Sequence, residues 1–190
     1  NGKSKDGSFL YPAFPYPNFT KLTRQDIFAI RAYLATLTPV SNAPRAPELR
    51  WPFNYRVVMR GWNWLFFKPG ILMPDQQKSA EWNRGRYLVE ALGHCGECHT
   101  PRNALGGGVK TRWLAGGPIP GQATGSFPNI TPSGLDWSEA DIAEYLSSGF
   151  TPDFDSAGGH MALVVRNFAK LTPEDRAAVA AYLKKVPLVE

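Results

Sequence analysis

The chain has 190 residues, a length that fits one domain of ordinary size or two small ones. Its composition, 43% hydrophobic and 19% charged, is that of a globular protein and excludes wholesale disorder, while only two cysteines exclude a disulfide-rich framework. The formal net charge of +5 arises from scattered Lys and Arg residues, so charge favours nucleic acid no more than an acidic protein or a membrane surface.

The first predicted helix follows Thr23 and belongs to a segment that recurs near the end of the chain. Residues 19–34 align without gaps with residues 168–183, at an offset of 149. Thr23 and Thr172 are each followed three residues later by an Asp, a spacing typical of a helix N-terminus that the threonine caps. In the second copy, Asp175 is expected to reach back to the backbone N–H of the cap.

Both copies are predicted to be amphipathic helices, because apolar residues recur in them every three or four positions. In the first copy these residues are Ile27, Ile30, Tyr33, Leu34 and Leu37, and in the second they are Val179, Tyr182, Leu183 and Val186. The second set is expected to dock on the helix that bears Tyr87 and Leu88.

The segments between the two copies also favour helices joined by loops. Residues 41–50 form a proline-punctuated linker, and helices are predicted over residues 56–67, 80–94 and 138–149. The last of these is expected to start at Ser138, with Asp141 three residues on. Residues 100–136 are rich in Gly and Pro without a convincing period, so they are predicted to be loop. No alternating strand pattern is present, and the fold class is therefore all-α. The aromatic residues of the first of these helices are expected to be core, with a partner surface as the alternative: Trp62, Trp64, Phe66 and Phe67.

The internal repeat also predicts the domain organisation. Residues 1–40 are interpreted as the C-terminal remnant of an upstream unit, because they match only the end of the later copy. Residues 41–80 are interpreted as a linker with a packing helix. Residues 81–190 are predicted to form one whole unit.

Both cysteines fall in a single Cys-x-x-Cys-His motif at residues 95–99. On a helical turn, Cys95 and Cys98 point the same way, so each thiol can form a thioether with one vinyl group of the same haem. His99 can then bind the iron as the proximal ligand. The motif predicts one covalently bound haem c, with its iron, in this chain.

Two other chemistries are weighed for the same motif. A structural zinc site needs four ligands, and only the three histidines His94, His99 and His160 could add to the cysteines. A redox-active thiol pair normally follows a strand and opens a helix, and no such pattern precedes Gly93. Haem is therefore the favoured cofactor.

Five residues are candidates for the second iron ligand: Met59, Met73, Met161, His94 and His160. Met161 is favoured, because Gly158 and Gly159 before it predict a loop that can approach the haem, and a thioether on a flexible stem reaches iron easily. In an extended segment His160 would point to the opposite side. His160 is the alternative ligand, and core filling is the alternative role of Met161. Arg102 and Arg112 could steady the haem propionates or simply be solvated.

The motif and its surroundings resemble a known family. Residues 82–90, 93–103 and 128–131 look like the cytochrome c subunits of membrane-bound bacterial dehydrogenases that act on alcohols, gluconate, sorbitol and aldehydes. The resemblance implies a c-type cytochrome fold with long irregular loops, a series of haem domains, and Met161 as the distal ligand. It also implies a periplasmic location at the outer face of the inner membrane.

The predicted function is electron transfer, not catalysis. Cys95, Cys98 and His99 would hold the haem, and His99 and Met161 would bind its iron. By resemblance, the partners would be a dehydrogenase catalytic subunit and a quinone or oxidase acceptor, with no nucleic acid. The alternatives are a peroxidase-type haem enzyme with an open iron position and a zinc-stabilised interaction module.

Overall fold

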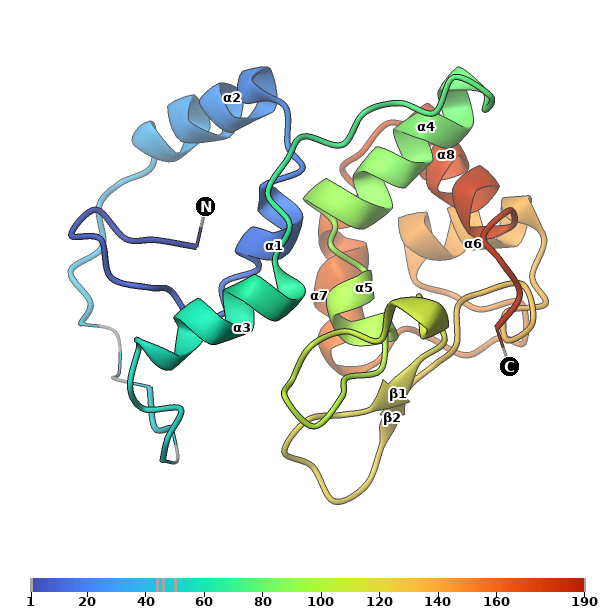
Figure 1. Cartoon of the computed structure of the whole chain (residues 1–190). Helices are drawn as coiled ribbons and strands as arrows, with labels where there is room; N and C mark the ends of the chain where they lie inside the picture. Colours follow the sequence, from blue (N-terminus) through green and yellow to red (C-terminus); the bar gives the residue numbers. More distant parts are fainter. Residues whose placement is uncertain (1, 44, 46, 50, 190) are drawn as a thin grey trace. The chain divides into compact units, whose positions relative to one another are not determined.

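The chain divides into two compact units, residues 1–72 and 73–190. The computed structural model describes residues 2–43, 45, 47–49 and 51–189 (Figure 1). Unit 1 contains α1 (Tyr16–Phe19), α2 (Arg24–Ala35) and α3 (Val58–Phe66). Unit 2 contains α4 (Ala80–Tyr87), the π-helix η1 (Leu88–Leu92), α5 (Gly96–His99), the 3-10 helix η2 (Lys110–Arg112), β1 (Gly117–Pro118), β2 (Ser126–Phe127), α6 (Glu139–Ser148), α7 (Gly159–Phe168) and α8 (Pro173–Leu183).

The predicted predominance of helix is confirmed, with one small exception. β1 and β2 form an antiparallel pair in which Gly117 faces Phe127 and Pro118 faces Ser126. This pair lies inside the Gly- and Pro-rich segment that the sequence predicts to be loop. Two-residue strands are too short to produce an alternating pattern, so no sequence signal precedes them.

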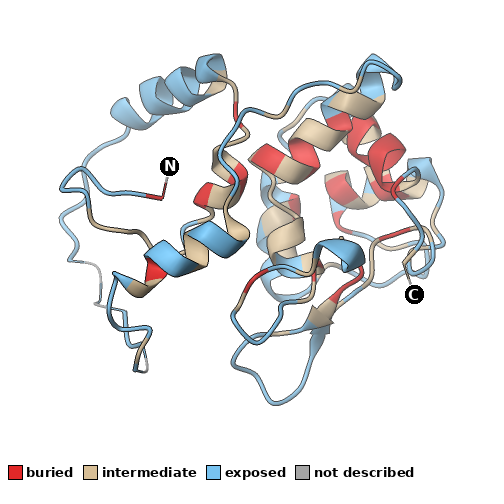
Figure 2. Ribbon diagram, in the orientation of Figure 1, coloured by how far each residue is buried: buried red, intermediate tan, exposed pale blue. Residues whose placement is uncertain are grey.

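The core of unit 2 forms where α4, η1 and α6 pack against α8. The predicted apolar stripe of α8 is buried here, and Val179, Tyr182, Leu183 and Val186 are each at most 6% exposed. Figure 2 shows the buried residues of this core on η1, α6 and α8. The docking that the sequence predicts between the last helix and the helix before the cysteines is therefore confirmed.

Gly85 lets α4 and α8 approach each other closely. A Cβ atom at this position would lie 1.8 Å from the carbonyl oxygen of Ala178, a distance that no packing adjustment can accommodate. The absence of a side chain at Gly85 therefore sets the separation of the two helices, and with it the geometry of the core.

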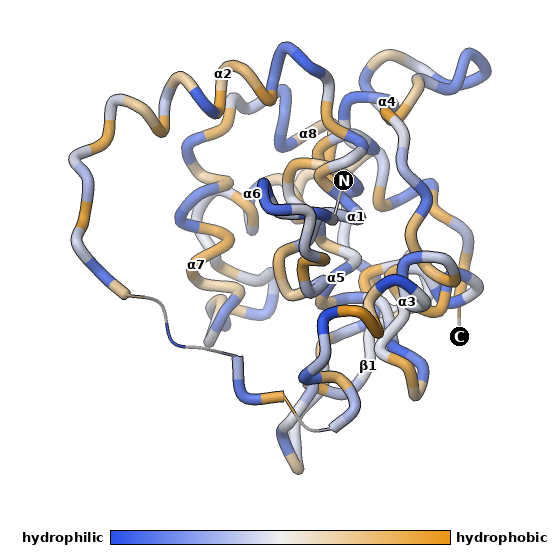
Figure 3. Tube along the Cα trace, turned by 60° about the vertical axis from the view of Figure 1, so that its left-hand side comes forward, coloured by the Kyte–Doolittle hydropathy of each residue, from blue (hydrophilic) through white to orange (hydrophobic). Residues whose placement is uncertain are grey.

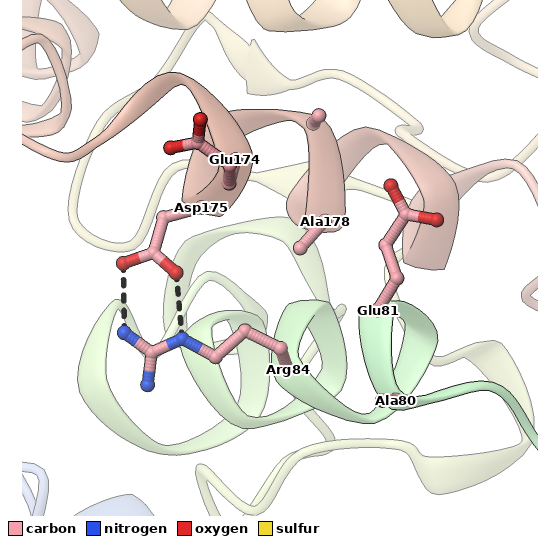
Figure 4. Close-up of a pocket in the computed structure, with 7 residues that line it drawn as sticks. Ala80, Glu81, Arg84, Glu174, Asp175 and Ala178 are labelled. Atoms are coloured by element: carbon pink, nitrogen blue, oxygen red, sulfur yellow. Dashed lines mark hydrogen bonds and ion pairs between the residues drawn. The ribbon is translucent and has the colours of Figure 1, made fainter.

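The predicted helix caps are confirmed, with one difference. The Thr172 side chain accepts a hydrogen bond from the backbone N–H of Asp175, and Ser138 forms a full capping box with Asp141. The Asp175 carboxylate does not reach back to the cap as predicted. It accepts two hydrogen bonds from Arg84, Nε to Oδ1 at 2.6 Å and Nη2 to Oδ2 at 2.7 Å (Figure 4). The guanidinium on α4 offers a bidentate, charged partner that outcompetes a single backbone N–H.

This ion pair lines an open hollow of about 430 Å³ between the N-terminal parts of α4 and α8. Figure 4 draws the residues that line it. None of residues 95–99 takes part in its lining.

The segment before the last helix differs from its prediction. Residues 158–161 are expected to be loop, but α7 begins at Gly159. Gly158 is the N-cap, and Gly159 has a positive φ of 51°. The two glycines therefore mark the start of a helix, and the apolar positions 161, 164, 165 and 168 that follow have the spacing of one helical face. The helix predicted over residues 80–94 also changes character, because its last part is the π-helix η1.

Unit 1 has few buried residues. Within its described part these are Gly2, Tyr16, Asn18, Leu22 and Met59. The Thr23 cap on α2 is confirmed, but the predicted apolar stripe is largely exposed, with Tyr33 at 65% and Leu34 at 58%. Figure 3 shows the hydrophobic residues that recur along α2. On α3, Met59 is buried and Trp62, Phe66 and the following Phe67 are half-buried, whereas Trp64 is 84% exposed and is not core.

Crossing a bilayer requires a long apolar helix, and no helix in the described part of the chain has that length and hydropathy.

Candidate haem site

Cys95, Cys98 and His99 lie on a single helical turn in unit 2. Cys95 is the N-cap of α5, and its carbonyl accepts hydrogen bonds from the N–H groups of Cys98 at 3.3 Å and His99 at 2.9 Å. The two cysteines are one turn apart, so their side chains leave the same side of the helix. Neither forms a disulfide. The turn therefore offers two thiols to one planar ligand.

Trp113 supports this turn from outside the motif. A Cβ atom at Gly96 would lie 2.2 Å from two atoms of the Trp113 ring, so the ring packs directly on the glycine backbone. The Trp113 Nε1–H donates to the Tyr182 hydroxyl at 3.3 Å, and this hydroxyl donates to Glu90 Oε1 at 3.0 Å. The attachment turn is thus connected to α8 and η1.

The His99 ring is oriented by a backbone carbonyl. Its Nδ1 lies 2.9 Å from the Pro128 carbonyl oxygen, which can only accept a hydrogen bond, so Nδ1 carries the proton and the lone pair is on Nε2. Burial lowers the pKa of His99, opposed by the bond to Pro128, and so favours the neutral ring. A neutral imidazole with a free Nε2 lone pair is the form that binds iron.

The loops around His99 are pinned by Leu114, which is fully buried and has a positive φ of 63°. Its N–H donates to the Thr100 Oγ1 at 3.0 Å, and its carbonyl accepts from the Ile130 N–H at 2.9 Å. The Gly116 N–H donates to the carbonyl of His99 at 2.7 Å. These bonds hold the irregular segment between α5 and α6 against the histidine.

The two thiols are not activated as redox-active cysteines are. Burial raises the pKa of Cys95 to about 12. Burial also raises the pKa of Cys98, with a further increase from Glu97 and an opposing effect from Arg102. Catalytic and redox-active cysteines have lowered pKa values, so these surroundings count against a thiol-exchange site.

The candidates for the second iron ligand lie in different surroundings. Met161 is in the first turn of α7 and packs, half-buried, against the core of unit 2. His160 and Met73 are exposed, and His94 directly precedes Cys95. Met59 is buried in unit 1. The predicted extended segment is wrong for residues 160 and 161, because successive side chains in a helix are about 100° apart and do not alternate.

Arg102 is engaged in its own loop. It pairs with Glu97 at 2.5 Å and donates to the carbonyls of Glu97 and Gly106. Arg112 is exposed. A propionate contact for either residue stays a prediction.

Sequence reasoning singled out the thiols and the histidine but missed the residues that position them. Trp113 and Leu114 carried no signal beyond their place in a Gly-rich segment. Pro128 was noted only as part of a family match. Its proximity to His99 is a contact between residues 29 positions apart, which only the fold creates.

The donor set fits haem c better than zinc. Nowhere in the described ranges do three or more His, Cys, Asp or Glu side chains gather as a metal site would require. Two thiols one turn apart, followed by an oriented neutral histidine, match the attachment of a haem through two thioethers and one iron ligand. This arrangement defines the class of c-type cytochromes.

The chain belongs to the cytochrome c family, whose model matches residues 83–187, more than half of the sequence. Covalently bound haem c, with its iron, is therefore its cofactor.

Three relatives are similar over nearly the whole chain. A diheme cytochrome c-type protein from Cereibacter sphaeroides is 54% identical over 190 residues, which are all of this chain and 64% of that protein. The fructose dehydrogenase cytochrome subunit from Gluconobacter japonicus is 35% identical over 98% of this chain and 39% of its own length. The cytochrome c subunit of a quinone-type alcohol dehydrogenase from Gluconacetobacter polyoxogenes is 37% identical over 100% of this chain and 42% of its own length. The chain thus spans less than two thirds of each relative.

Proposed function

We propose that this protein transfers single electrons through one haem c that Cys95 and Cys98 attach and His99 binds. The observation that carries the proposal is the α5 turn, where two thiols leave one side of the helix beside a histidine whose Nδ1 is already engaged by Pro128. Bound haem supplies a one-electron iron couple. The chain contributes attachment, ligand orientation and exclusion of water.

Met161 is proposed as the second residue that would bind the iron. Its place at the start of α7 and its packing against the core of unit 2 hold the thioether on a fixed element, whereas His160 beside it is exposed. Ligation by His and Met leaves no open iron position for a substrate, and it raises the reduction potential. An electron carrier is therefore favoured over the peroxidase-type alternative.

The electron donor is proposed to be a dehydrogenase catalytic subunit, and the acceptor a quinone or an oxidase. Support comes from the relatives named as cytochrome subunits of a fructose dehydrogenase and of a quinone-type alcohol dehydrogenase. The resemblance also supports a periplasmic location, with attachment to the outer face of the inner membrane. Cell fractionation tests it: haem-stained protein should be in the periplasm or be released from membranes by salt, and recovery in the cytosol would contradict it.

Optical spectroscopy and mass spectrometry test the haem assignment. Acid and organic solvent should not extract the haem, and one adduct should map to the peptide that contains Cys95 and Cys98. The spectrum should be low-spin in both oxidation states. Extractable haem or a missing adduct would refute the attachment, and a high-spin ferric spectrum would favour the peroxidase-type alternative. A Cys95→Ser, Cys98→Ser double variant is the control, because it should lack the adduct.

Residues 1–40 are proposed to be the C-terminal part of a second cytochrome-like unit, followed by a linker and packing helix over residues 41–80 and a whole cytochrome c unit over residues 81–190. Support comes from the repeat itself. α2 and α8 have the same threonine cap, but the apolar face is buried on α8 and exposed on α2. The coding sequence upstream of Asn1 should encode another Cys-x-x-Cys-His motif, and its absence there would overturn the proposal.

A further inference from the structure

We propose that Asn129 is a positioning residue for His99, and that its side chain joins the C-terminal segment at Val189 to the same hydrogen-bond network. The inference rests on the proposed function, because it assigns His99 as the proximal iron ligand.

Asn129 fixes the backbone that orients His99. Its Oδ1 accepts hydrogen bonds from the Thr131 N–H at 2.9 Å and from the Thr131 hydroxyl at 2.7 Å, which closes a turn around Ile130. Thr131 is 0% exposed, so both bonds are shielded from water. The Pro128 carbonyl and the Asn129 N–H belong to one planar peptide group, and locking Asn129 therefore locks the carbonyl that accepts from His99 Nδ1.

The other end of the Asn129 side chain holds the C-terminal segment. Its Nδ2 donates to the Val189 carbonyl at 2.8 Å. Ser133 binds the same residue twice, donating to the Val189 carbonyl at 2.6 Å and accepting from the Val189 N–H at 3.2 Å. The Asn129 Nδ2 also donates to the Ser133 Oγ at 3.5 Å, so the two arms share the asparagine amide and form one network.

Gly134 provides the space that this network occupies. A Cβ atom at Gly134 would lie 2.5 Å from both Cβ and Cγ of Asn129. The backbone at this point therefore accommodates the asparagine side chain, and every polar atom of that side chain is used. Such completeness is expected of a side chain that fixes geometry and not of one that merely fills a surface loop.

The network affects His99 through the strength of the hydrogen bond from its Nδ1–H to the Pro128 carbonyl. Donation from Nδ1–H to a well-aligned carbonyl makes the imidazole a better electron donor at Nε2, which favours the ferric state. Loosening the Pro128 carbonyl weakens that donation. The reduction potential of the haem-loaded protein should then rise, and the Nδ1 proton should exchange faster with solvent.

The test compares Asn129→Ala with the parent protein, both loaded with haem. Spectroelectrochemistry should show a higher reduction potential, and NMR of the ferrous protein should show His99 Nδ1–H exchange accelerated about fivefold or more, the factor that loss of one ordinary hydrogen bond gives. Ser133→Ala removes part of the C-terminal arm and leaves the Oδ1 turn. It should accelerate exchange of the Val189 amide and raise the potential by a smaller amount.

Asn83→Ala is the matched control. Asn83 also uses both ends of its side chain, but it binds the backbone of Asp75, Lys78 and Ser79 and no residue near His99. This variant should lose stability without a change in the potential or in Nδ1–H exchange. If its potential shifts as much as that of Asn129→Ala, the effect is general destabilisation and the inference is wrong.

The remaining outcomes separate the inference from the function on which it rests. A parent protein without covalent haem refutes the proposed function. A haem-loaded Asn129→Ala with the parent's potential and exchange rate refutes the positioning role alone. If Asn129→Ala does not fold, Thr131→Val decides, because it removes one of the two bonds to Oδ1 with little change in shape. An unchanged potential and exchange rate in that variant refutes the inference.

Discussion

Met161 and His160 are adjacent in α7, yet Met161 packs half-buried against the core of unit 2 whereas His160 is exposed. Met161→Ala should therefore open the iron to carbon monoxide and abolish the weak sulfur-to-iron absorption band at the red end of the visible spectrum. Carbon monoxide titration of the ferrous protein and the ferric spectrum measure both effects.

His160→Ala is the control for this substitution. His160 is exposed, so the variant should keep the absorption band and resist carbon monoxide. If instead His160→Ala opens the iron and Met161→Ala does not, the ligand pair is two histidines.

The ion pair between Arg84 and Asp175 makes stability depend on pH. Hydrogen bonds from Arg84 hold the pKa of Asp175 below its ordinary value of 3.8. A carboxylate with a lowered folded-state pKa stabilises the fold fully above that ordinary value, and the contribution is lost as the pH falls through the lowered pKa. Because the Arg84 side chain is 45% exposed, Arg84→Met should reduce the free energy of unfolding at neutral pH by only about 0.5–1 kcal/mol.

Urea unfolding at several pH values measures the difference in free energy of unfolding between Arg84→Met and the parent protein. This difference should fall to zero in acid. Arg166→Met, at an exposed position on α7, serves as the control and should show no such fall. If the stability difference between Arg84→Met and the parent keeps its neutral-pH size at a pH well below 3.8, the assignment is wrong.

At the scale of residues, the sequence could predict roles that depend on neighbours a few positions away, but not roles that depend on contacts between distant segments. Cys95, Cys98 and His99 act through a five-residue spacing, so the spacing alone indicated their chemistry. Pro128 and Trp113 act on the same turn from distant loops, and their roles depend on contacts that have no local pattern.

At the scale of elements, the crossing of α4 and α8 is the most constrained contact in unit 2. Gly85→Ala would place a methyl group 1.8 Å from the Ala178 carbonyl oxygen, so the helices must separate. We expect a loss of about 3 kcal/mol in the free energy of unfolding, measured by urea denaturation.

Gly61→Ala is the corresponding control, because Gly61 is also helical and a Cβ atom there would meet nothing within 4 Å. This substitution should be neutral or stabilising by up to about 1 kcal/mol, since alanine favours helix over glycine. Equal losses in the two variants would show that the loss at Gly85 does not come from the crossing of α4 and α8.

The two copies of the repeat provide a second matched pair. Leu183 on α8 is 6% exposed and Leu34, at the equivalent place on α2, is 58% exposed. Leu183→Ala should cost about 2–4 kcal/mol, whereas Leu34→Ala in the same 190-residue chain should change stability by less than about 0.5 kcal/mol. Thermal or urea unfolding measures both. A large cost for Leu34→Ala in this chain would show that its face is already covered.

Helix ends with local chemistry were predictable from sequence. Thr172 caps α8 and Ser138 caps α6 as predicted, because each capping hydrogen bond joins residues three positions apart. The start of α7 was not predicted, because Gly158 and Gly159 favour a loop that approaches the haem, although a glycine can equally occupy the N-cap. The widening of the helix at η1 was also missed, since no residue preference distinguishes a π turn from an α turn here.

At the scale of the whole molecule, the two units differ in how many of their described residues are buried. Unit 2 has a continuous core, whereas the buried residues in the described part of unit 1 are few. We expect brief proteolysis to cut first within residues 1–72 and to leave a haem-containing fragment that begins near Met73. Mass spectrometry of the haem-stained fragment identifies the cut. Early cleavage between α4 and α8 would contradict the expectation.

The all-α class followed from periodicity, and the position of the haem turn from its motif, because both signals are local. The boundary between the units was not predictable to the residue. The compact units meet at residues 72 and 73, within the segment 41–80 that the sequence predicts to be a linker with a packing helix. A boundary of this kind is decided by which side chains pack together, and composition only approximates it.

The conformation of Leu114 has a consequence for how this site can vary. A left-handed backbone favours glycine, while complete burial demands a large apolar side chain, so the position faces two opposed requirements. Isoleucine and valine are apolar enough to be buried, but they disfavour the left-handed backbone, because branching at Cβ causes steric crowding at a positive φ. Branching at the β-carbon, and not hydrophobicity, therefore decides which apolar residues are tolerated at position 114. Among homologous sequences, unbranched residues should replace one another at this position while the usual interchange of leucine with isoleucine is rare.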